Sequence, residues 1–476
     1  MERKTRIVAT LGPATDRPGV LETILETGLD VARVNFSHGS PEEHKERVDR
    51  LRRLAAHRSR PLAILGDLPG PKLRALLSEP IELTPGQDIS LGRTNDAGDI
   101  KLTEPELLEK AAIDQRILLD DGRLQLRVTK VTKEVVVATV VTGGKLLPNK
   151  GVNLPDTPLT IEVVTPRDRA ALAIAAEVGV DWLALSFVRA PYAADELRAT
   201  ARSHGLSVPI MAKIERPEAV RCATELVETF DGIMVARGDL GVEIPLQQVP
   251  QVQKKLINHA REAGKPVVTA TDMLDSMRSN PRPTRAEASD VANAVYDGTD
   301  AIMLSGETAI GDYPVEAVKF MDLLAREAES HIDDEHWREL YVPRGEIRDH
   351  ITHMTCELAH EIHAQAIITP TDSGRTPRMV ARHRPNVRMI APAPDENVMR
   401  QLAMSWGVTP VFLDRNLVPE GADRLEADVE AAFRSGAVKE GERVIVVAGH
   451  PLEGSQQGLP TVRVVRIGPG GKSIAP

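Results

Sequence analysis

Charged side chains stand at the ends of several short apolar runs in this chain. Lys213 and Glu215 end one run, and Asp239 follows the next. Side chains on a strand repeat every two residues, so Lys213 and Glu215 project on the same side. Glu215 and Asp239, from adjacent strands, could bind a hard divalent cation, Mg²⁺ or Mn²⁺, with positions left for water and substrate oxygens. Lys213 and Arg33 would add positive charge for a phosphoryl group. These residues predict a Mg²⁺-dependent enzyme acting on an anionic, phosphorylated small molecule.

Other runs also end in polar residues, namely Asp67, Ser186, Thr271, Ser305 and Glu307. A strand can end in a polar residue simply because it reaches the surface, and surface exposure could explain any one of these residues. It does not explain why nearly every strand ends in a charged or hydroxyl side chain. In a barrel of parallel strands, polar groups at the carboxyl ends of strands form the active site.

The elements that would position these residues are short β-branched runs alternating with helix-period segments, the pattern of βα units. Eight strands are expected, at 6–12, 30–36, 61–68, 181–188, 208–215, 231–238, 266–273 and 300–307. Helices are expected between them, including 40–56, 166–178, 247–263 and 314–331. This count predicts an α/β fold of the (β/α)₈ TIM-barrel type. A doubly wound sheet is the alternative, but no Gly-x-Gly-x-x-Gly turn follows any strand.

Two segments depart from the βα pattern. Residues 75–157 show period-two alternation with turn pairs at Asp121-Gly122 and Gly143-Gly144, which predicts a compact β module inserted into a barrel loop as a lid. After a break near 332–345, helices and strands resume as a separate α/β domain. The expected domains are a catalytic barrel (1–70 and 158–333), a β lid (71–157) and a C-terminal allosteric domain (334–476).

Composition narrows the class of protein. The net charge of −10 argues against nucleic acid or an anionic membrane as the main partner. The chain has two cysteines, Cys222 and Cys356, which are too few for a disulfide framework. This low number is typical of proteins in a reducing compartment. No apolar run is long enough to span a bilayer, and no secretory leader is expected, because the first residues, MERKTRIVATLG, lack the apolar region of one. A cytoplasmic location is expected.

Many of these segments together resemble pyruvate kinase. The matching motifs, in the family's order, are RVNFSHG (33–39), DLPGPKLR (67–74), KGVNLP (150–155), AKIER (212–216), DGIMVARGDLGVEIP (231–245), ATDMLDSM (270–277), PRPTRAEASDVANAV (281–295) and MLSGETAIGDYP (303–314). The resemblance implies a glycolytic homotetramer that transfers the phosphoryl group of phosphoenolpyruvate to ADP. Two alternatives remain open: another Mg²⁺-dependent barrel, such as a mutase or aldolase, and a metabolite-sensing relative without catalysis.

The resemblance also assigns roles. Arg33 and Lys213 would bind the transferring phosphoryl group, and Glu215 and Asp239 would hold Mg²⁺. The backbone around Gly238 would receive the substrate carboxylate at a helix start. The residues implied near the methylene carbon and its proton-delivering water chain are Thr271, Ser305 and Glu307. Those implied in contacts with ADP or its phosphates are Asn35, Ser37, His38, Arg74 and Lys150.

The chain departs from the family at its K⁺ site. Asn35, Ser37 and Asp67 are present, but Leu68 replaces a threonine and Lys72 replaces a glutamate after Gly-Pro. A lysine ammonium can supply the single positive charge of a monovalent cation. The chain resembles the family's K⁺-independent branch at both positions, which implies activity without K⁺.

A phosphate-binding loop is expected in the C-terminal domain. Ser373, Gly374, Arg375 and Thr376 follow a strand and open a helix, and they resemble the family's allosteric phosphate loop. Asp372 would add negative charge beside this loop and disfavour a bisphosphate. A sugar monophosphate or AMP is the preferred effector, fructose 1,6-bisphosphate is the alternative, and an unregulated enzyme is the third possibility.

Overall fold

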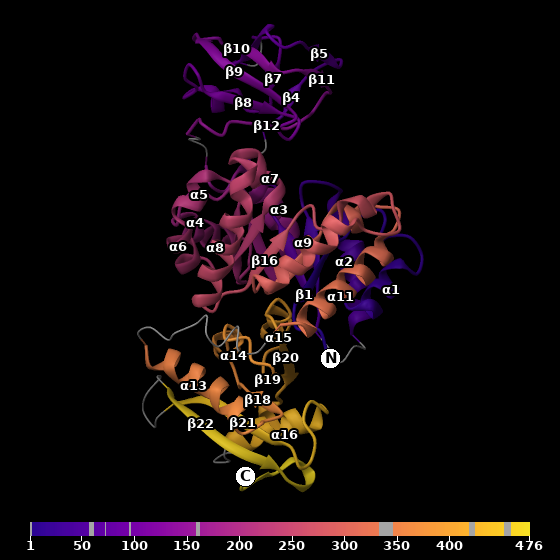
Figure 1. The fold of residues 1–476 in the computed structure, drawn as a ribbon, viewed down its shortest axis with the longest axis vertical. Coiled ribbons are helices and arrows are strands. Elements are labelled where there is room, and N and C mark those ends of the chain that lie inside the picture. The colour runs from indigo at the N-terminus through magenta and orange to yellow at the C-terminus, as the bar shows by residue number, and fades with distance from the viewer. Residues whose placement is uncertain are drawn as a thin grey trace.

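Three bodies are stacked along the long axis of the molecule in the computed structural model (Figure 1). A β-rich module lies at one end, a barrel in the middle and an α/β domain at the other end. The structure describes residues 2–56, 61–71, 73–94, 97–158, 162–332, 346–417, 424–451 and 458–476. No helix within these ranges is long and apolar enough to cross a bilayer.

The middle body is a closed barrel of parallel strands in the order β1-β17-β16-β15-β14-β13-β3-β2, which confirms the expected fold class. The strands are β1 (Arg6–Thr10), β2 (Val31–Asn35), β3 (Ala63–Asp67), β13 (Trp182–Leu185), β14 (Ile210–Ile214), β15 (Gly232–Ala236), β16 (Val267–Ala270) and β17 (Ala301–Leu304). Nearly all their residues are buried, because one side of each strand faces the barrel interior and the other faces the helices.

Helices cover the outside of the barrel and several begin with strong capping signals. Ser40, Thr165 and Thr284 each form a capping box with the acidic residue three positions later, at the starts of α2, α3 and α9. The principal helices are α1 (Val20–Thr27), α2 (Pro41–Ala55), α3 (Pro166–Val178), α4 (Ala193–Ser203), α5 (Pro217–Arg221), α6 (Ala223–Thr229), α7 (Arg237–Glu243), α8 (Val249–Glu262), α9 (Arg285–Tyr296), α10 (Gly306–Ala309) and α11 (Pro314–Ser330).

An antiparallel β module follows β3 and precedes α3. Its main sheet has the order β12-β8-β9-β10-β6, and the pairs β11-β5 and β4-β7 complete it. The strands are β4 (Ala75–Leu76), β5 (Ile81–Leu83), β6 (Asp88–Gly92), β7 (Lys101–Leu102), β8 (Arg116–Leu119), β9 (Leu124–Val131), β10 (Val135–Thr142), β11 (Gly144–Leu146) and β12 (Val152–Asn153).

The two glycine turns in this module differ. Asp121-Gly122 lies between the paired strands β8 and β9, and both residues have positive φ (55° and 81°), as a tight hairpin requires. Gly143-Gly144 does not close a hairpin, because β11 leaves the main sheet and pairs with β5. A Cβ on Gly143 would lie 2.2 Å from the Leu83 carbonyl oxygen, so this crossing requires glycine.

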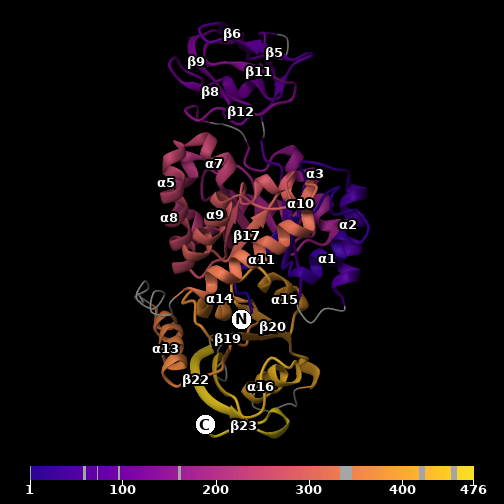
Figure 2. The same ribbon diagram turned by 45° about the vertical axis from the view of Figure 1, so that its right-hand side comes forward.

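The C-terminal domain has a six-stranded sheet in the order β20-β19-β18-β21-β22-β23. Its strands are β18 (Ala366–Ile368), β19 (Arg388–Ala393), β20 (Val408–Phe412), β21 (Arg443–Pro451), β22 (Gly458–Ile467) and β23 (Ser473–Ile474). Its helices are α13 (Ile347–Glu361), α14 (Arg375–Ala381), α15 (Glu396–Leu402) and α16 (Arg424–Arg434). Figures 1 and 2 show α14 and α15 between this sheet and the barrel.

Residues at the end of α15 and just after it pack against the interior of the barrel. Met404 is fully buried in one apolar cluster with interior barrel residues such as Met211 and Met234. Trp182, at the start of β13, donates its indole N–H to the Gln401 carbonyl at 3.1 Å. The C-terminal domain therefore supplies part of the barrel core.

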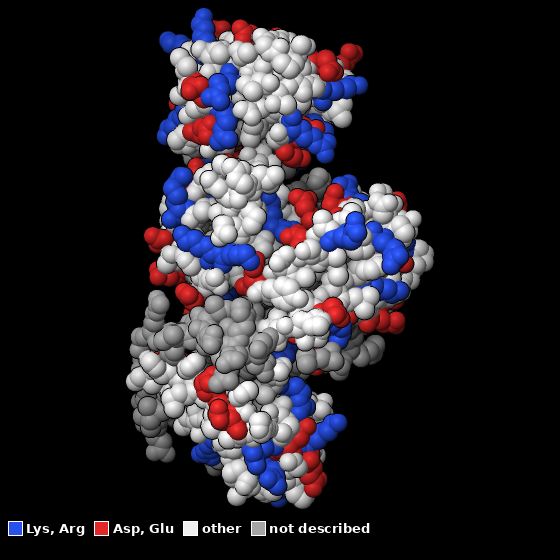
Figure 3. Space-filling model, viewed as in Figure 1, with Lys and Arg blue, Asp and Glu red and all other residues white. Residues whose placement is uncertain are grey.

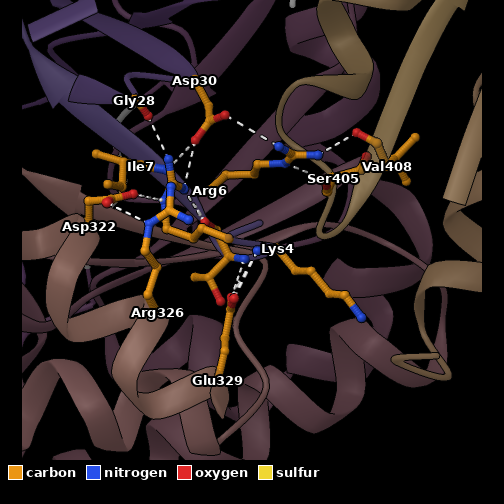
Figure 4. A network of polar contacts seen from close by, with 12 residues as sticks. Lys4, Arg6, Ile7, Gly28, Asp30, Asp322, Arg326, Glu329, Ser405 and Val408 are labelled. Carbon is orange, nitrogen blue, oxygen red and sulfur yellow. Dashed lines mark hydrogen bonds and ion pairs between the residues drawn. The ribbon is translucent and has the colours of Figure 1, made fainter. Parts of the chain in front are cut away.

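Polar contacts join the same two bodies near the N-terminus (Figure 4). Arg6 on β1 donates to the carbonyls of Ser405 and Val408 and lies 3.3 Å from Asp30. Lys4 donates its backbone N–H to Glu329 on α11 and its ammonium to the Pro385 carbonyl. On the face drawn in Figure 3, acidic and basic residues are interspersed.

Candidate active site

The predicted site residues converge because the barrel register aligns the carboxyl ends of its strands. Thr10 pairs with Arg33 between β1 and β2, and Asn35 pairs with Asp67 between β2 and β3. On the neighbouring side, Lys213 and Met234 pair between β14 and β15. The strands are parallel, and the chain leaves the carboxyl end of β3 for the inserted module, so the carboxyl ends of these strands share the end of the barrel from which that module departs.

Asp67 lies between the two predicted phosphoryl-binding cations. Its carboxylate accepts from Arg33 Nε at 2.7 Å and lies 3.3 Å from Lys213 Nζ. Complete burial alone would raise the pKa of Asp67, but Lys213 and Arg33 outweigh it and lower that pKa. Asp67 is thus an ionised counterion that fixes the directions of both side chains.

Lys213 is held by three oxygens. Its Nζ lies 2.9 Å from Glu215 Oε1, near Asp67, and donates to Ser186 Oγ at 2.8 Å. Burial lowers the pKa of Lys213, but attraction from Asp67 and Glu215 gives a net rise. The ammonium therefore stays charged at neutral pH inside a nearly closed site.

Glu215 is fully buried between a backbone donor and Lys213. Its Oε2 accepts the Phe187 N–H at 2.6 Å, and its Oε1 lies 2.9 Å from the Lys213 ammonium. Burial raises the pKa of Glu215, Lys213 opposes this rise, and Asp239 adds to it. A divalent cation would relieve both the burial cost and the repulsion between these two carboxylates.

Asp239 does not belong to a strand, contrary to expectation. Strand β15 ends at Ala236, and Asp239 lies in the first turn of α7. The negative charge of Asp239 contributes to the raised pKa of Glu215. Within the described ranges, no three His, Cys, Asp or Glu residues form a metal site. A pair of carboxylates fits Mg²⁺, which commonly takes its other ligands from water and substrate.

Thr271 has an unusual backbone conformation just after β16. Its φ is +67°, which is rare for a β-branched residue and marks a strained position. Its Oγ accepts the Gly238 N–H at 2.6 Å and donates to the Ala270 carbonyl at 2.7 Å. The Gly238 N–H expected to face a substrate carboxylate is therefore already bonded, so an incoming carboxylate would have to replace Thr271.

Ser305 and Glu307 follow β17 and differ in their bonding. Both oxygens of Glu307 accept backbone N–H groups, from Ser305 at 2.7 Å and from Leu274 at 3.2 Å. Burial raises the pKa of Glu307. The buried Ser305 hydroxyl oxygen has no hydrogen-bond partner within the part of the chain that the structure describes. Its hydrogen-bonding capacity is therefore unused, and Glu307 orders the loop backbone around it.

The residues expected to contact the nucleotide lie in two groups. Asn35, Ser37 and His38 lie at the end of β2 and in the loop after it, where Asn35 Oδ1 accepts the Ser37 N–H at 3.1 Å. Arg74 and Lys150 lie together at the base of the inserted module. Arg74 donates to the Asn149 carbonyl at 2.8 Å, and Lys150 lies 2.7 Å from Asp120.

The monovalent-cation positions are only partly described. Asn35, Ser37 and Asp67 lie close together on β2, β3 and the following loop, and Leu68 is buried at 1% exposure. Leu68 offers no oxygen from its side chain. Lys72 lies outside the described residues.

The expected effector loop has the predicted turn before a helix. Gly374 is the N-cap of α14 with φ of +77°, Arg375 begins that helix, and Thr376 follows it. The Gly374 N–H is already bonded to Thr371 Oγ at 2.8 Å, and Ser373 is exposed. Asp372 forms an ion pair with Arg415, so its negative charge is balanced and does not simply face the loop as expected.

One polar network at the mouth of the barrel was missed from the sequence. Arg216 forms a buried ion pair with Glu243 at 2.8 Å and donates to the Leu154 carbonyl at 3.2 Å. Asn153 donates to the other Glu243 oxygen at 2.8 Å. These contacts fasten the base of the inserted module to the barrel. Arg216 follows Glu215 directly, but nothing local identifies Glu243 as its partner.

Known families match almost the whole chain. A model described as "Pyruvate kinase, barrel domain" matches residues 2–318, and one described as "Pyruvate kinase, alpha/beta domain" matches residues 349–465. The chain belongs to the pyruvate kinase family. "Pyruvate kinase" of Geobacillus stearothermophilus is 44% identical over 465 residues, 95% of this chain and 78% of the relative. "Pyruvate kinase" of Methylorubrum extorquens is 42% identical over 476 residues, 98% of this chain and 97% of the relative.

Membership of the pyruvate kinase family makes this chain a phosphotransferase. "Pyruvate kinase 2" of Synechocystis is 40% identical to this chain over 471 residues. The match covers 94% of this chain and 77% of the relative. Pyruvate kinases generally use Mg²⁺, and the pair Glu215 and Asp239 has the donor chemistry for that ion.

Proposed function

We propose that this chain transfers the phosphoryl group of phosphoenolpyruvate to ADP, giving pyruvate and ATP, in cytoplasmic glycolysis. The observation that carries the proposal is the buried cluster of Lys213, Arg33, Asp67 and Glu215 at the mouth of the barrel. Two fixed cations beside buried carboxylates are suited to an anionic group that moves between two oxygens.

The cations supply most of the proposed catalysis. Arg33 and Lys213 would bind the phosphoryl oxygens, and Asp67 holds both in place so that little reorganisation is needed as charge moves. Glu215 and Asp239 would hold Mg²⁺, which when bound neutralises negative charge on substrate oxygens. Gly238 and Thr271 would bind the substrate carboxylate by exchanging their present mutual hydrogen bond.

Protonation of the enolate would take place near Thr271. A threonine hydroxyl is a poor acid, so a water relay is the better route. The Ser305 hydroxyl, which has no hydrogen-bond partner among the described residues, would order such a water, and Glu307 fixes the Ser305 backbone. On the nucleotide side, Lys150 and Arg74 would approach ADP phosphates as the module of residues 71–157 closes over the barrel domain (1–70 and 158–333).

A mutase or aldolase acting on a similar substrate is the competing enzyme class. It would need neither ADP nor the inserted module with Lys150. A coupled assay that measures pyruvate from phosphoenolpyruvate, with and without ADP, tests the proposal. ADP-dependent pyruvate formation supports it, whereas turnover without ADP, or no turnover, contradicts it.

Activity without K⁺ is the first specific prediction. We expect turnover in tetramethylammonium buffer to change by less than about twofold on adding K⁺, because Lys72 supplies the positive charge and Leu68 removes a ligand oxygen. Lys72→Glu is expected to restore K⁺ dependence. Many-fold K⁺ stimulation of the unmodified enzyme would contradict this.

The second specific prediction is allosteric regulation through residues 373–376 of the C-terminal domain (334–476). AMP or a sugar monophosphate is expected to raise Tm, since a ligand at about 100 times its Kd stabilises by about 2.7 kcal/mol. Arg375→Ala should abolish the shift. Absence of any Tm shift with these compounds and with a sugar bisphosphate would exclude the effector site.

The assembly is proposed to be a homotetramer, and light scattering of the full chain tests its mass.

A further inference from the structure

Two connections join the inserted module to the barrel, and a charged side chain of the barrel holds the returning one. On the outgoing side, the Gly70 N–H donates to Asp168 at 2.8 Å. On the returning side, Arg216 donates to the carbonyls of Leu154 at 3.2 Å and Thr157 at 3.4 Å. The position of the returning connection therefore depends on one long side chain.

Arg216 is itself fixed by two carboxylates. It is 1% exposed and pairs with Glu243 at 2.8 Å and with Glu218 at 3.0 Å. Glu243 is 2% exposed and also accepts from the Asn153 side chain at 2.8 Å. A buried ion pair resists separation, because each partner would become an uncompensated charge. Arg216, Glu243 and Asn153 form a connection between barrel and module that we call the hinge clamp.

The hinge clamp is built on the two segments that carry the proposed Mg²⁺ ligands. Arg216 directly follows Glu215 in the chain. Glu243 is the last residue of α7, and Asp239 lies in the first turn of the same helix. Each charged member of the clamp therefore belongs to a segment that also holds a proposed metal ligand.

The helix α7 also lies beside the part of the module that holds Lys150. The turn Asp121-Gly122 reaches this helix, since a Cβ built on Gly122 would lie 3.4 Å from Val242 Cγ1. Asp120, next to this turn, pairs with Lys150 at 2.7 Å. The orientation of the module on α7 therefore determines where the Lys150 ammonium lies relative to the barrel mouth.

We propose that Arg216 is a positioning residue for the nucleotide: through Glu243 it fixes the orientation of the module, and with it the approach of Lys150 to the ADP phosphates. The link to ADP rests on the proposed function, whereas the fixed orientation does not. Without the clamp the module would adopt more orientations. Bound ADP would then lose contacts, while Arg33 and Lys213 keep their places in the barrel.

Distances between spin labels measure this orientation without turnover. Labels at Lys130→Cys on β9 and Lys255→Cys on α8, both exposed positions, are read by double electron–electron resonance after Cys222→Ser and Cys356→Ser. We expect Arg216→Gln to broaden the distance distribution. The arginine-to-lysine variant at this position keeps the charge but has fewer donors, so it should restore the narrow distribution only in part.

Arg382→Gln is the matched control. Arg382 also joins two bodies, through an ion pair with Asp349 at 2.7 Å and a hydrogen bond to the Glu262 carbonyl at 2.9 Å. Its replacement should lower Tm and leave the distance distribution unchanged. Asn153→Ala leaves the ion pair of the clamp intact and should broaden the distribution less, which keeps the proposal testable if the arginine variant does not fold.

Steady-state kinetics test the link to the nucleotide. In Arg216→Gln we expect the KM for ADP to rise by about tenfold, on the scale of one lost charge-assisted contact, and the KM for phosphoenolpyruvate to change by less than about twofold. A distribution as narrow as in the unmodified chain would overturn the proposal, as would equal increases in both KM values. No pyruvate formation by the unmodified chain, with a broadened distribution in the variant, would contradict the proposed function and support the fixed orientation.

Discussion

Lys213→Gln is expected to lower kcat by about 10³-fold, with a smaller change in the KM for phosphoenolpyruvate. Removing one preorganised group that stabilises transition-state charge typically costs 10²–10³ in rate. Here the same ammonium also pairs with Asp67 and Glu215, so its loss leaves buried Glu215 without a cation and Asp67 with Arg33 alone. Steady-state kinetics of pyruvate formation measure the effect.

Lys213→Arg separates charge from geometry. The guanidinium keeps the positive charge but is bulkier than the site between Ser186 and Glu215, so only partial recovery of kcat is expected. Measured Tm values show whether either variant has lost its fold. A kcat within tenfold of the unmodified enzyme for Lys213→Gln would remove Lys213 from the catalytic machinery.

Glu215→Gln is expected to raise the Mg²⁺ concentration for half-maximal activity by at least about tenfold and to lower kcat/KM by about 10²-fold. The amide has nearly the shape of the carboxylate but lacks its charge, and a hard cation with two carboxylate ligands would lose half of their charge. Direct Mn²⁺ binding, followed by electron paramagnetic resonance, should weaken in parallel, which gives a readout apart from turnover.

Asp181→Asn is the matched control for that variant. Asp181 is also a buried barrel carboxylate, at 3% exposure, but it lies at the opposite end of β13 and pairs with Arg52 and Arg400. Its replacement should lower Tm while leaving the Mn²⁺ affinity unchanged. Unchanged Mn²⁺ affinity in Glu215→Gln would contradict the proposed metal site.

Local patterns in the sequence were sufficient for the barrel. Strands buried on both faces require nearly continuous Val, Ile, Leu and Ala, so all eight runs were visible, and the helix-period segments 40–56 and 166–178 correspond to α2 and α3. Strand alternation alone placed Lys213 and Glu215 on the same side. The patterning was weaker for the turn at Gly143-Gly144, because a glycine pair fits a hairpin and a strand crossing equally well.

The sequence by itself determined which residues stand at the strand ends; the tertiary structure decided how they are bonded. Asp67 became the shared counterion of Arg33 and Lys213 only because closure of the barrel brings β2, β3 and β14 to one mouth. The pair Arg216–Glu243 and the hydrogen bond between Thr271 and Gly238 likewise join segments distant in sequence. Periodicity specifies the face on which a side chain projects, whereas its partner depends on long-range packing that no local preference encodes.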